Sequence, residues 1–174
     1  MNHEQWNKAR SFHGHECPGL AIGVRACEAA IIKMGITPSP DEELVCVTEN
    51  DACGVDAIQA LLGCTLGKGN LIYKNIGKQA FTFYRRSDGQ ALRFYLKSRN
   101  EGMDRAQYQQ YLLSAPIDEL FDYHEVDGPP PQRASIFTSV KCESCGELAA
   151  ETHIRLQQGK QICMDCFIKY ERGW

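Results

Sequence analysis

The sequence predicts an α+β protein in which helices pack on a mainly antiparallel sheet, followed by a small zinc-binding domain. Three observations carry this prediction. Residues 18–35 repeat apolar side chains at helical spacing, residues 78–98 contain two strand-like segments around a turn, and four cysteines follow in two C-x2-C pairs. We therefore expect a core domain at residues 1–126, a proline-rich linker at 127–137 and a four-cysteine domain at 138–174.

Two helices are predicted in the first third of the chain. Residues 18–35 begin at a proline, which suits a first helical turn, and end at Gly35, which suits a C-terminal cap. Residues 51–63 form the second helix, with Asp51 as its N-cap and a glycine as its stop. Residues 43–50, which are rich in strand-favouring side chains, form a strand between the two helices.

The middle of the chain predicts strands and then further helix. Residues 70–77 suit a short strand, while residues 78–86 and 90–98 flank a Ser-Asp-Gly turn and predict a β-hairpin. Residues 104–123 predict one broken helix or two short helices, interrupted at Pro116. Three consecutive prolines farther on fit neither a helix nor the interior of a sheet, which places the linker there.

The composition is that of a globular protein of 174 residues, with 43% hydrophobic and 24% charged residues. The net charge of -3 gives no general attraction to nucleic-acid phosphates. No apolar segment approaches the roughly 20 residues that span a bilayer, and the first ten residues lack the apolar core of a signal peptide. We therefore expect a cytoplasmic protein without membrane contact, whose nine cysteines are mostly free thiols.

The C-terminal cysteines have the spacing of a structural zinc site. Cys142 and Cys145 form one C-x2-C pair, and Cys163 and Cys166 form the other. Four thiolates close the coordination shell of Zn2+, and a segment of this size draws its folding free energy from metal binding. Iron is the alternative, because four sulfurs also suit iron. Positive and negative side chains balance in this domain, so nucleic-acid binding is not expected.

A second cluster precedes the first predicted helix, where His13, His15 and Cys17 occupy alternate positions. A helix N-terminus stabilises a thiolate, so Cys17 suits a metal ligand or a nucleophile, with His15 or His13 as its partner or base. Cys53, in the first turn of the second helix, is the candidate that completes the site. His15 is favoured as the companion of Cys17, while His13 is either a further metal ligand or a residue that only orients the turn. The alternative is a capped turn without a function.

The glycine-rich loop at residues 63–70 resembles a phosphate loop only superficially, because its glycine and lysine spacing differs from that of a P-loop. Its glycines still permit a ligand to approach the backbone closely, with Lys68 as the cation that binds it. The alternative is a plain tight turn. Cys27, Cys46 and Cys64 occupy apolar positions, and we expect them to be buried as small hydrophobic residues.

Four ordered motifs resemble the FmdE family of formylmethanofuran dehydrogenase components over most of residues 10–125: HGHECPG at 13–19, DACGVDAIQ at 51–59, GCTLGKGNL at 63–71, and the hairpin after the Gly-Lys at 77–78. The resemblance implies an α+β core, zinc in the finger and a homodimer. It also implies a shared pocket lined by His13, His15, Cys17 and Cys53. The C-terminal domain is similar to the four-cysteine, treble-clef-like fingers that many members carry.

Three functional hypotheses follow. The first is a metal-binding protein that serves a metalloenzyme as an accessory subunit or metal-handling partner, as the family's link to a molybdenum or tungsten complex implies. It would hold Zn2+ in the finger and a second Zn2+ or another transition metal in the core. The second is a small enzyme acting on a one-carbon or acyl substrate, with Cys17 as nucleophile or zinc ligand and His15 as base. The third is a regulator whose finger docks on protein or RNA.

Overall fold

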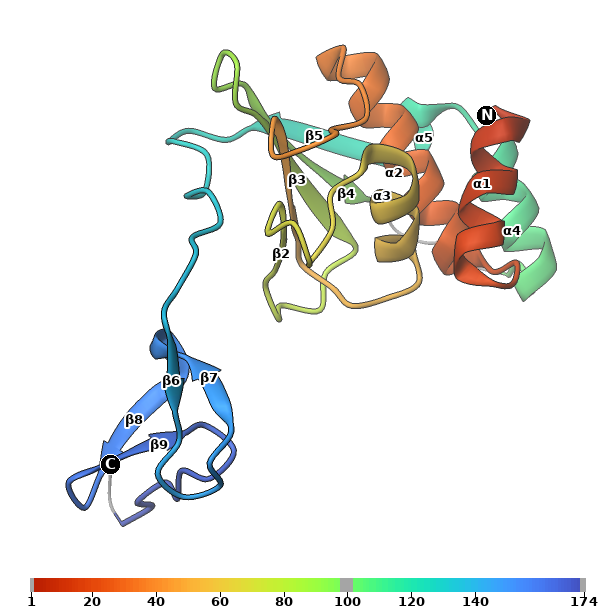
Figure 1. The fold of residues 1–174 in the computed structure, drawn as a ribbon. Coiled ribbons are helices and arrows are strands. Elements are labelled where there is room, and N and C mark those ends of the chain that lie inside the picture. Colours follow the sequence, from red (N-terminus) through yellow and green to blue (C-terminus); the bar gives the residue numbers. More distant parts are fainter. Residues whose placement is uncertain (1, 98–101, 173–174) are drawn as a thin grey trace. The chain divides into compact units, whose positions relative to one another are not determined.

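A computed structural model describes residues 2–97 and 102–172 of the chain (Figure 1). The chain divides into two compact units, Met1–Ala134 and Ser135–Trp174, each described by itself below. The end of the predicted second hairpin strand at Ser98 and the last two residues of the predicted zinc-binding domain lie outside the described residues. Within the described ranges, none of the helices is long and apolar enough to cross a membrane.

The first unit is a five-stranded sheet with helices packed on one face (Figure 1). Its strand order is β2-β1-β3-β4-β5, and every neighbouring pair is antiparallel except β1 and β2. The predicted mainly antiparallel α+β core is therefore confirmed. The elements in chain order are α1 His3–His13, α2 Pro18–Met34, β1 Leu44–Thr48, α3 Gly54–Leu62, β2 Leu71–Tyr73, β3 Ala80–Arg85, β4 Ala91–Leu96, α4 Arg105–Ser114, α5 Ile117–Leu120 and β5 Phe121–Glu125.

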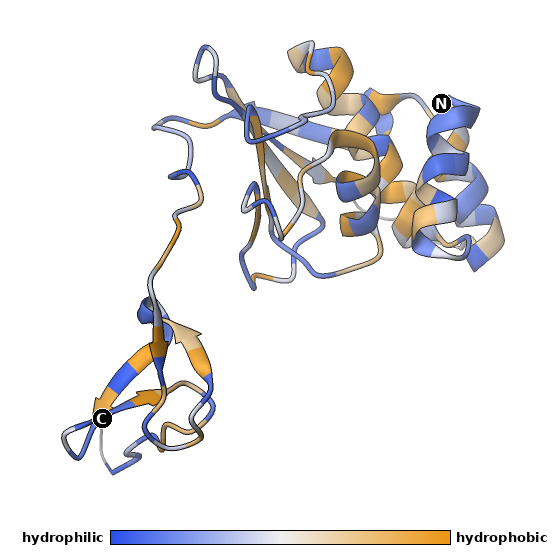
Figure 2. Ribbon diagram, in the orientation of Figure 1, coloured by the Kyte–Doolittle hydropathy of each residue, from blue (hydrophilic) through white to orange (hydrophobic). Residues whose placement is uncertain are grey.

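The hydrophobic core lies between the sheet and the helices. Phe81, Phe83 and Phe94 of the central strands are fully buried and form one cluster with Leu20 of α2 and Ile58 of α3. α2 is buried along most of its length, and its ribbon is largely apolar, whereas α1 is mostly polar (Figure 2). Burial of these large side chains stabilises the unit by about 1.5–3 kcal/mol each.

The parallel pair of strands determines where α3 begins. β1 and β2 pair with Cys46 opposite Leu71, and α3 lies between them in the sequence as the crossover connection. Parallel strands require such a crossover, because a tight hairpin cannot join them. The segment that leaves the carboxyl end of β1 therefore leads directly into the N-terminus of α3.

Two segments differ from the expected elements. α1 forms in the polar N-terminal segment, for which no helix is predicted, and it is anchored by the buried side chains of Trp6 and Ala9. The helix predicted after Pro116 ends at Leu120, and the chain continues as the edge strand β5. Four of the five β5 residues are exposed, so the segment lacks the alternating burial that marks an inner strand in a sequence.

The linker that is predicted at residues 127–137 is partly held by the core unit. The Arg86 guanidinium donates to the Pro131 carbonyl at 2.8 Å, and the backbone N–H of Ala134 donates to the Glu42 carboxylate at 3.2 Å. Arg86 also donates to the Glu42 backbone carbonyl at 2.8 Å. Glu42 and Arg86 thus fix the first part of the linker against the core.

The second unit consists of two small β-hairpins. Its elements are β6 Ser139–Lys141, β7 Leu148–Ala150, the 3-10 helix Glu151–His153, β8 Ile154–Gln157 and β9 Lys160–Cys163. β6 pairs with β7 and β8 pairs with β9, both antiparallel. Only Cys142, Ile162 and Cys163 form its buried cluster among the described residues. So small an apolar core requires an additional source of folding free energy, as metal binding provides.

Candidate metal centre

Cys17 stands at the N-cap of α2, as the sequence predicts. Its backbone is extended, Pro18 follows in the first turn, and its Sγ accepts the backbone N–H of Leu20 at 3.3 Å. The side chain is nearly buried, with 2% of the residue exposed. The helix N-terminus therefore places positive partial charge at a thiol that water barely reaches.

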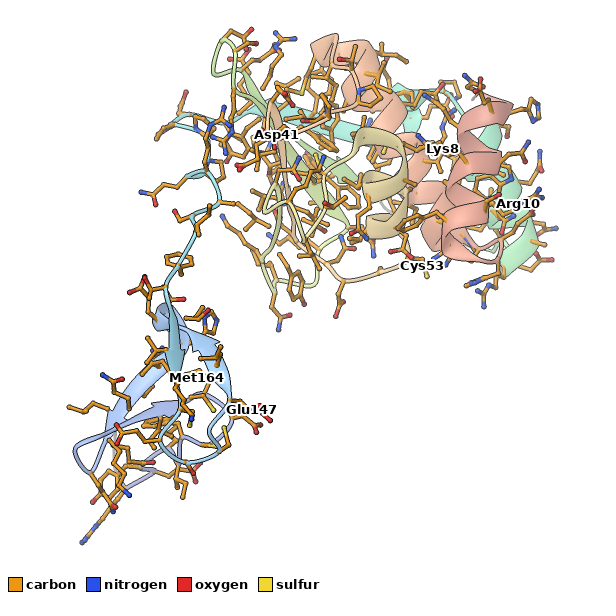
Figure 3. All side chains as sticks on the ribbon, in the orientation of Figure 1. Lys8, Arg10, Asp41, Cys53, Glu147 and Met164 are labelled. Carbon is orange, nitrogen blue, oxygen red and sulfur yellow. The ribbon has the colours of Figure 1, made fainter. Side chains whose placement is uncertain are left out.

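Cys53 stands at the N-cap of α3 (Figure 3). The prediction that Asp51 caps this helix is wrong, because α3 begins at Gly54 and has no side-chain cap. The turn before it is held by Asn50, whose side-chain oxygen accepts the N–H of Ala52 at 3.2 Å. Asp51 is exposed and lines a cavity instead.

Glycines allow the starts of α2 and α3 to approach each other. A Cβ on Gly19 would lie 3.2 Å from the Cβ of Cys53 and 3.9 Å from the Sγ of Cys17. One turn later in α2, a Cβ on Gly23 would overlap the backbone of Gly54. The crossing is absent from the sequence-based expectations, although the four-residue spacing of Gly19 and Gly23 places both on one face of α2.

His13 completes the cluster from the last turn of α1. Its Nε2 lies 3.8 Å from the Sγ of Cys17, and its Nδ1 lies 2.7 Å from the Oδ2 of Asp56. One ligand atom each from His13, Cys17 and Cys53 lies within 4.8 Å of the others. The other oxygen of Asp56 accepts the side-chain N–H of Gln59 at 3.3 Å, so Asp56 is held on both sides.

The sequence favours His15 as the partner of Cys17, whereas the structure places His13 beside the two thiols. His15 is exposed, and its ring contacts that of His13 in a tilted arrangement with centroids 4.3 Å apart, whereas His13 faces the two thiols. The cause is α1, which extends to His13 and ends at Gly14 in a left-handed conformation. His13 is thereby fixed on a helix against α3, while His15 lies beyond the cap.

The two thiols suit a shared cation. Burial raises the pKa of Cys53, and a hydrogen bond with Cys17 and the charge of that thiol raise it further. Two adjacent thiolates repel each other unless a metal ion lies between them. In a tetrahedral zinc site a sulfur and a nitrogen ligand lie about 3.5 Å apart, close to the separation of Cys17 and His13. Two sulfurs and one imidazole nitrogen fit Zn2+.

A cavity of about 440 Å³ adjoins this cluster. His13 and Cys53 line it, as does Asp56, and its other walls include Leu66 and Tyr73. Lys68, the cation expected from the sequence, is not among the residues that line it. Its ammonium group instead donates to the backbone carbonyls of Ser39 at 2.9 Å and of Pro40 at 3.4 Å.

The finger cysteines form a second, separate cluster. Ligand atoms of Cys142, Cys145, Cys163 and Cys166 lie within 4.8 Å of one another, and the sulfurs of Cys145 and Cys163 are 3.9 Å apart. Two sulfurs of a tetrahedral zinc site are about 3.8 Å apart, so the cluster fits the ion. Hydrogen bonds from the backbone N–H groups of Cys163 and Cys145 lower the pKa of Cys142 to about 6.

The remaining three cysteines are buried in the core, as predicted. Cys27, Cys46 and Cys64 each have 0% exposure. Burial raises the pKa of all three thiols, that of Cys64 to about 12. They therefore pack as protonated hydrophobic side chains.

Comparison with known proteins places both units in families. The family described as FmdE, molybdenum formylmethanofuran dehydrogenase operon, matches residues 12–122, and the prokaryotic dksA/traR C4-type zinc finger matches residues 135–172. The chain is thus an α+β protein with a C-terminal zinc finger. Since the first match spans more than half of its length, it belongs to the FmdE family.

Two individual proteins are similar to this chain. A probable S-adenosyl-L-methionine-binding protein of Archaeoglobus fulgidus is 33% identical over an alignment of 196 positions, gaps included, which covers 94% of this chain and 52% of that protein. The chain thus spans about half the length of this curated relative. A tungsten formylmethanofuran dehydrogenase FmdE-like protein from Syntrophus aciditrophicus has a crystal structure that covers 94% of this chain and 90% of its own, with a TM-score of 0.67 and 21% identity. It shares the fold.

Proposed function

We propose that this protein serves a metalloenzyme as a metal-handling accessory protein, and that His13, Cys17 and Cys53 hold a second metal ion besides that of the finger. Zn2+ is the first candidate, because two thiolates and an imidazole match its preferred ligands. Another transition metal with the same ligand preferences is the alternative. The proposed accessory role rests on the family membership, and the proposed metal site rests on the geometry of the core.

The observation that carries the metal site is the hydrogen bond between His13 and Asp56. A metal-binding histidine usually donates its other ring N–H to a carboxylate, which fixes the tautomer and raises the basicity of the ligand nitrogen. With Nδ1–H donating to Asp56 at 2.7 Å, the lone pair of Nε2 faces the sulfur of Cys17. The arrangement therefore supplies both the ligand atom and the group that orients it.

The proposed core site differs from the finger in its number of ligands. Four thiolates close a coordination shell, whereas three protein ligands leave one position open for water or a small molecule. The cavity shares His13 and Cys53 with the site, so an exogenous ligand has room beside the ion. A metal ion there would supply a Lewis acid, and the open position would also make it easier to remove than the metal of the finger.

A small metal-dependent enzyme is the second candidate, favoured by the cavity of about 440 Å³ beside the three ligands. Cys17 then acts as a ligand and not as a nucleophile, because 2% exposure leaves little access for a substrate. His15, exposed next to His13, is the candidate base. The description of the Archaeoglobus relative makes S-adenosyl-L-methionine the first small molecule to test for binding.

We also propose that the protein is a cytoplasmic homodimer and that its finger docks on a protein partner. Free thiols in both clusters suit a reducing compartment. The finger exposes Leu148, Leu156 and Ile168, apolar side chains of the kind found at protein interfaces. Light scattering of the purified chain tests the dimer, since a monomeric mass would contradict it.

Metal analysis of the purified protein tests the core site. We expect two equivalents of metal per chain, and one equivalent in a variant that combines Cys17→Ser with Cys53→Ser. The control is Cys27→Ala, which removes a buried thiol outside both clusters and should retain two equivalents. A value of one in the unsubstituted protein, unchanged by the double substitution, would exclude a core metal.

The handling role is tested by the rate of metal loss. A chelator added to the fully loaded protein should remove one equivalent rapidly and the second slowly, and the double variant should lose the rapid phase. Equal rates for both ions would contradict a labile core site. Transfer to a purified apo-metalloenzyme, compared between the unsubstituted and double-variant proteins, then tests the accessory function.

A further inference from the structure

We propose that the cavity beside the core metal site selects organic cations over neutral or anionic molecules of the same shape. The inference rests on the proposed core site, because it concerns the ligand that occupies the space next to the metal.

The described residues that line the cavity include two carboxylates and no Lys or Arg side chain. The carboxylates are those of Asp51 and Asp56. Lys68, on the neighbouring loop, is held by the carbonyls of Ser39 and Pro40 and does not line the cavity. An anionic molecule would therefore meet two carboxylates, while the His13 ring is already bonded to Asp56.

A zinc ion in the proposed core site would not make the net charge of the cavity positive. Zn2+ bound by the thiolates of Cys17 and Cys53 and by a neutral His13 is a site of zero net charge. The carboxylates of Asp51 and Asp56 then leave the loaded cavity with two negative charges. An organic monocation entering the cavity would gain attraction from both carboxylates, and this attraction is stronger beside apolar walls than in bulk water.

The two carboxylates have different surroundings. Asp56 is held by His13 and Gln59, so it contributes a fixed charge. Asp51 is exposed and lines the cavity together with Tyr73. Partial desolvation of the phenol, together with the nearby charge of Asp51, raises the pKa of Tyr73, so the phenol adds no negative charge to the lining at neutral pH. The exposed carboxylate of Asp51 can therefore contact a ligand directly.

The remaining walls suit an apolar body. Val55, Leu66 and Leu71 line the cavity together with the ring of Tyr73. An aromatic face attracts a cation through its quadrupole, in addition to its hydrophobic contact. The volume of about 440 Å³ falls in the range of small-molecule sites. These features fit an organic cation, such as an ammonium or sulfonium compound, with an apolar or aryl group attached.

Three probes of one shape test this selectivity. Benzyltrimethylammonium, benzyl methyl sulfone and benzylsulfonate carry positive, zero and negative charge, and none coordinates zinc strongly. Each is titrated into the zinc-loaded full chain, and binding is followed by NMR of the backbone amides of Ala52 and Cys53. We expect the cation to bind about five- to tenfold more tightly than the sulfone, with the sulfonate weakest. The preference should weaken at high salt.

Two matched substitutions locate the effect. Asp51→Asn should lower the preference for the cation about two- to fivefold, because it removes one charge from the lining. Glu125→Gln removes one charge from β5, at the opposite edge of the sheet from β2, and should leave the preference unchanged. Equal binding of the three probes, or equal effects of the two substitutions, would overturn the inference.

The metal content of each sample separates this inference from the proposed function. Two equivalents of metal with no preference for the cation would overturn the selectivity and leave the core metal site standing. One equivalent with a retained preference that Asp51→Asn reduces would contradict the core metal and support the selectivity, since the carboxylates of Asp51 and Asp56 remain.

Discussion

The backbones of Gly23 in α2 and Gly54 at the start of α3 lie in direct contact. A Cβ on Gly54 would lie 3.2 Å from the Cα of Gly23, and a Cβ on Gly23 would overlap the carbonyl group of Gly54. Backbones approach this closely only where side chains are absent. The contact holds the two helix starts together and thereby brings Cys17 next to Cys53.

Substitution of Gly23 by alanine should separate the two helices. The gain in helix propensity is about 1 kcal/mol, but the new methyl group would overlap the rigid backbone of Gly54. We expect a net loss of about 1–3 kcal/mol in the free energy of unfolding and weaker metal binding at the core site. The control is Gly67→Ala, where an added Cβ meets nothing within 4 Å. Urea titration measures the stability of both variants, and equal stability would contradict the expectation.

Asp56→Asn should weaken the core metal while leaving the finger intact. The amide keeps the size of the side chain but removes the charge that orients and polarises His13. Loss of such a supporting carboxylate typically reduces metal affinity about 10- to 100-fold. Competition with a chelator measures the affinity, with the finger as internal reference. Asp51→Asn, which alters the cavity but not His13, should change the affinity far less, and equal losses would refute the role of Asp56.

The ion pair between Glu49 and Arg93 should make the core less stable in acid. Arg93 donates to both oxygens of Glu49, at 2.6 and 2.8 Å, and these hydrogen bonds hold the pKa of the carboxyl below its ordinary value of about 4.3. The stabilisation is therefore fully present above that value, and it is lost as the pH falls through the lowered pKa of the folded state.

Glu49→Gln tests this pH dependence. At pH 7 the variant should lose about 1–3 kcal/mol of unfolding free energy, and the difference from the unsubstituted protein should shrink below pH 4. Urea unfolding of metal-free protein, followed by the fluorescence of the buried Trp6 in a Trp174→Phe background, isolates the core from the finger. A difference that stays constant from pH 7 to pH 3 would rule out the assigned role of Glu49.

Arg86→Ala should release the first part of the linker. The substitution removes the hydrogen bonds to the carbonyls of Pro131 and Glu42. We expect faster cleavage by a non-specific protease at residues 128–134, with little change elsewhere, because cleavage requires the backbone to leave the core. Arg133→Ala, which alters an exposed linker residue, serves as the control. Equal cleavage rates in the two variants would show that Arg86 does not fix the linker.

Local sequence patterns are sufficient to predict the four finger cysteines and the position of Cys17 in the core site. The C-x2-C pairs place all four finger ligands, because ligand spacing within a tight turn is set by the chain itself. Cys17 could be assigned to a helix start from the proline that follows it. The expected pairing with Cys53 depends on a contact between two helices, whose signal was the spacing of the glycines in α2.

The choice between His13 and His15 required tertiary structure. α1 has a polar sequence and is held by few buried side chains, so its apolar pattern is too weak to predict a helix. Without α1, the alternation of His13, His15 and Cys17 suggested an extended segment with all three on one face. The strand β5 was missed for a related reason, since an exposed edge strand lacks the burial pattern of an inner one.

Because three of the cysteines are buried in the core, the reactive thiols of the chain belong to its two clusters. Cys27, Cys46 and Cys64 are inaccessible and have raised pKa values, so oxidants and alkylating reagents at neutral pH find almost no thiolate there. The other six of the nine cysteines belong to the core and finger clusters. Oxidative stress would therefore act on this protein first as a loss of bound metal, long before it damaged the hydrophobic interior.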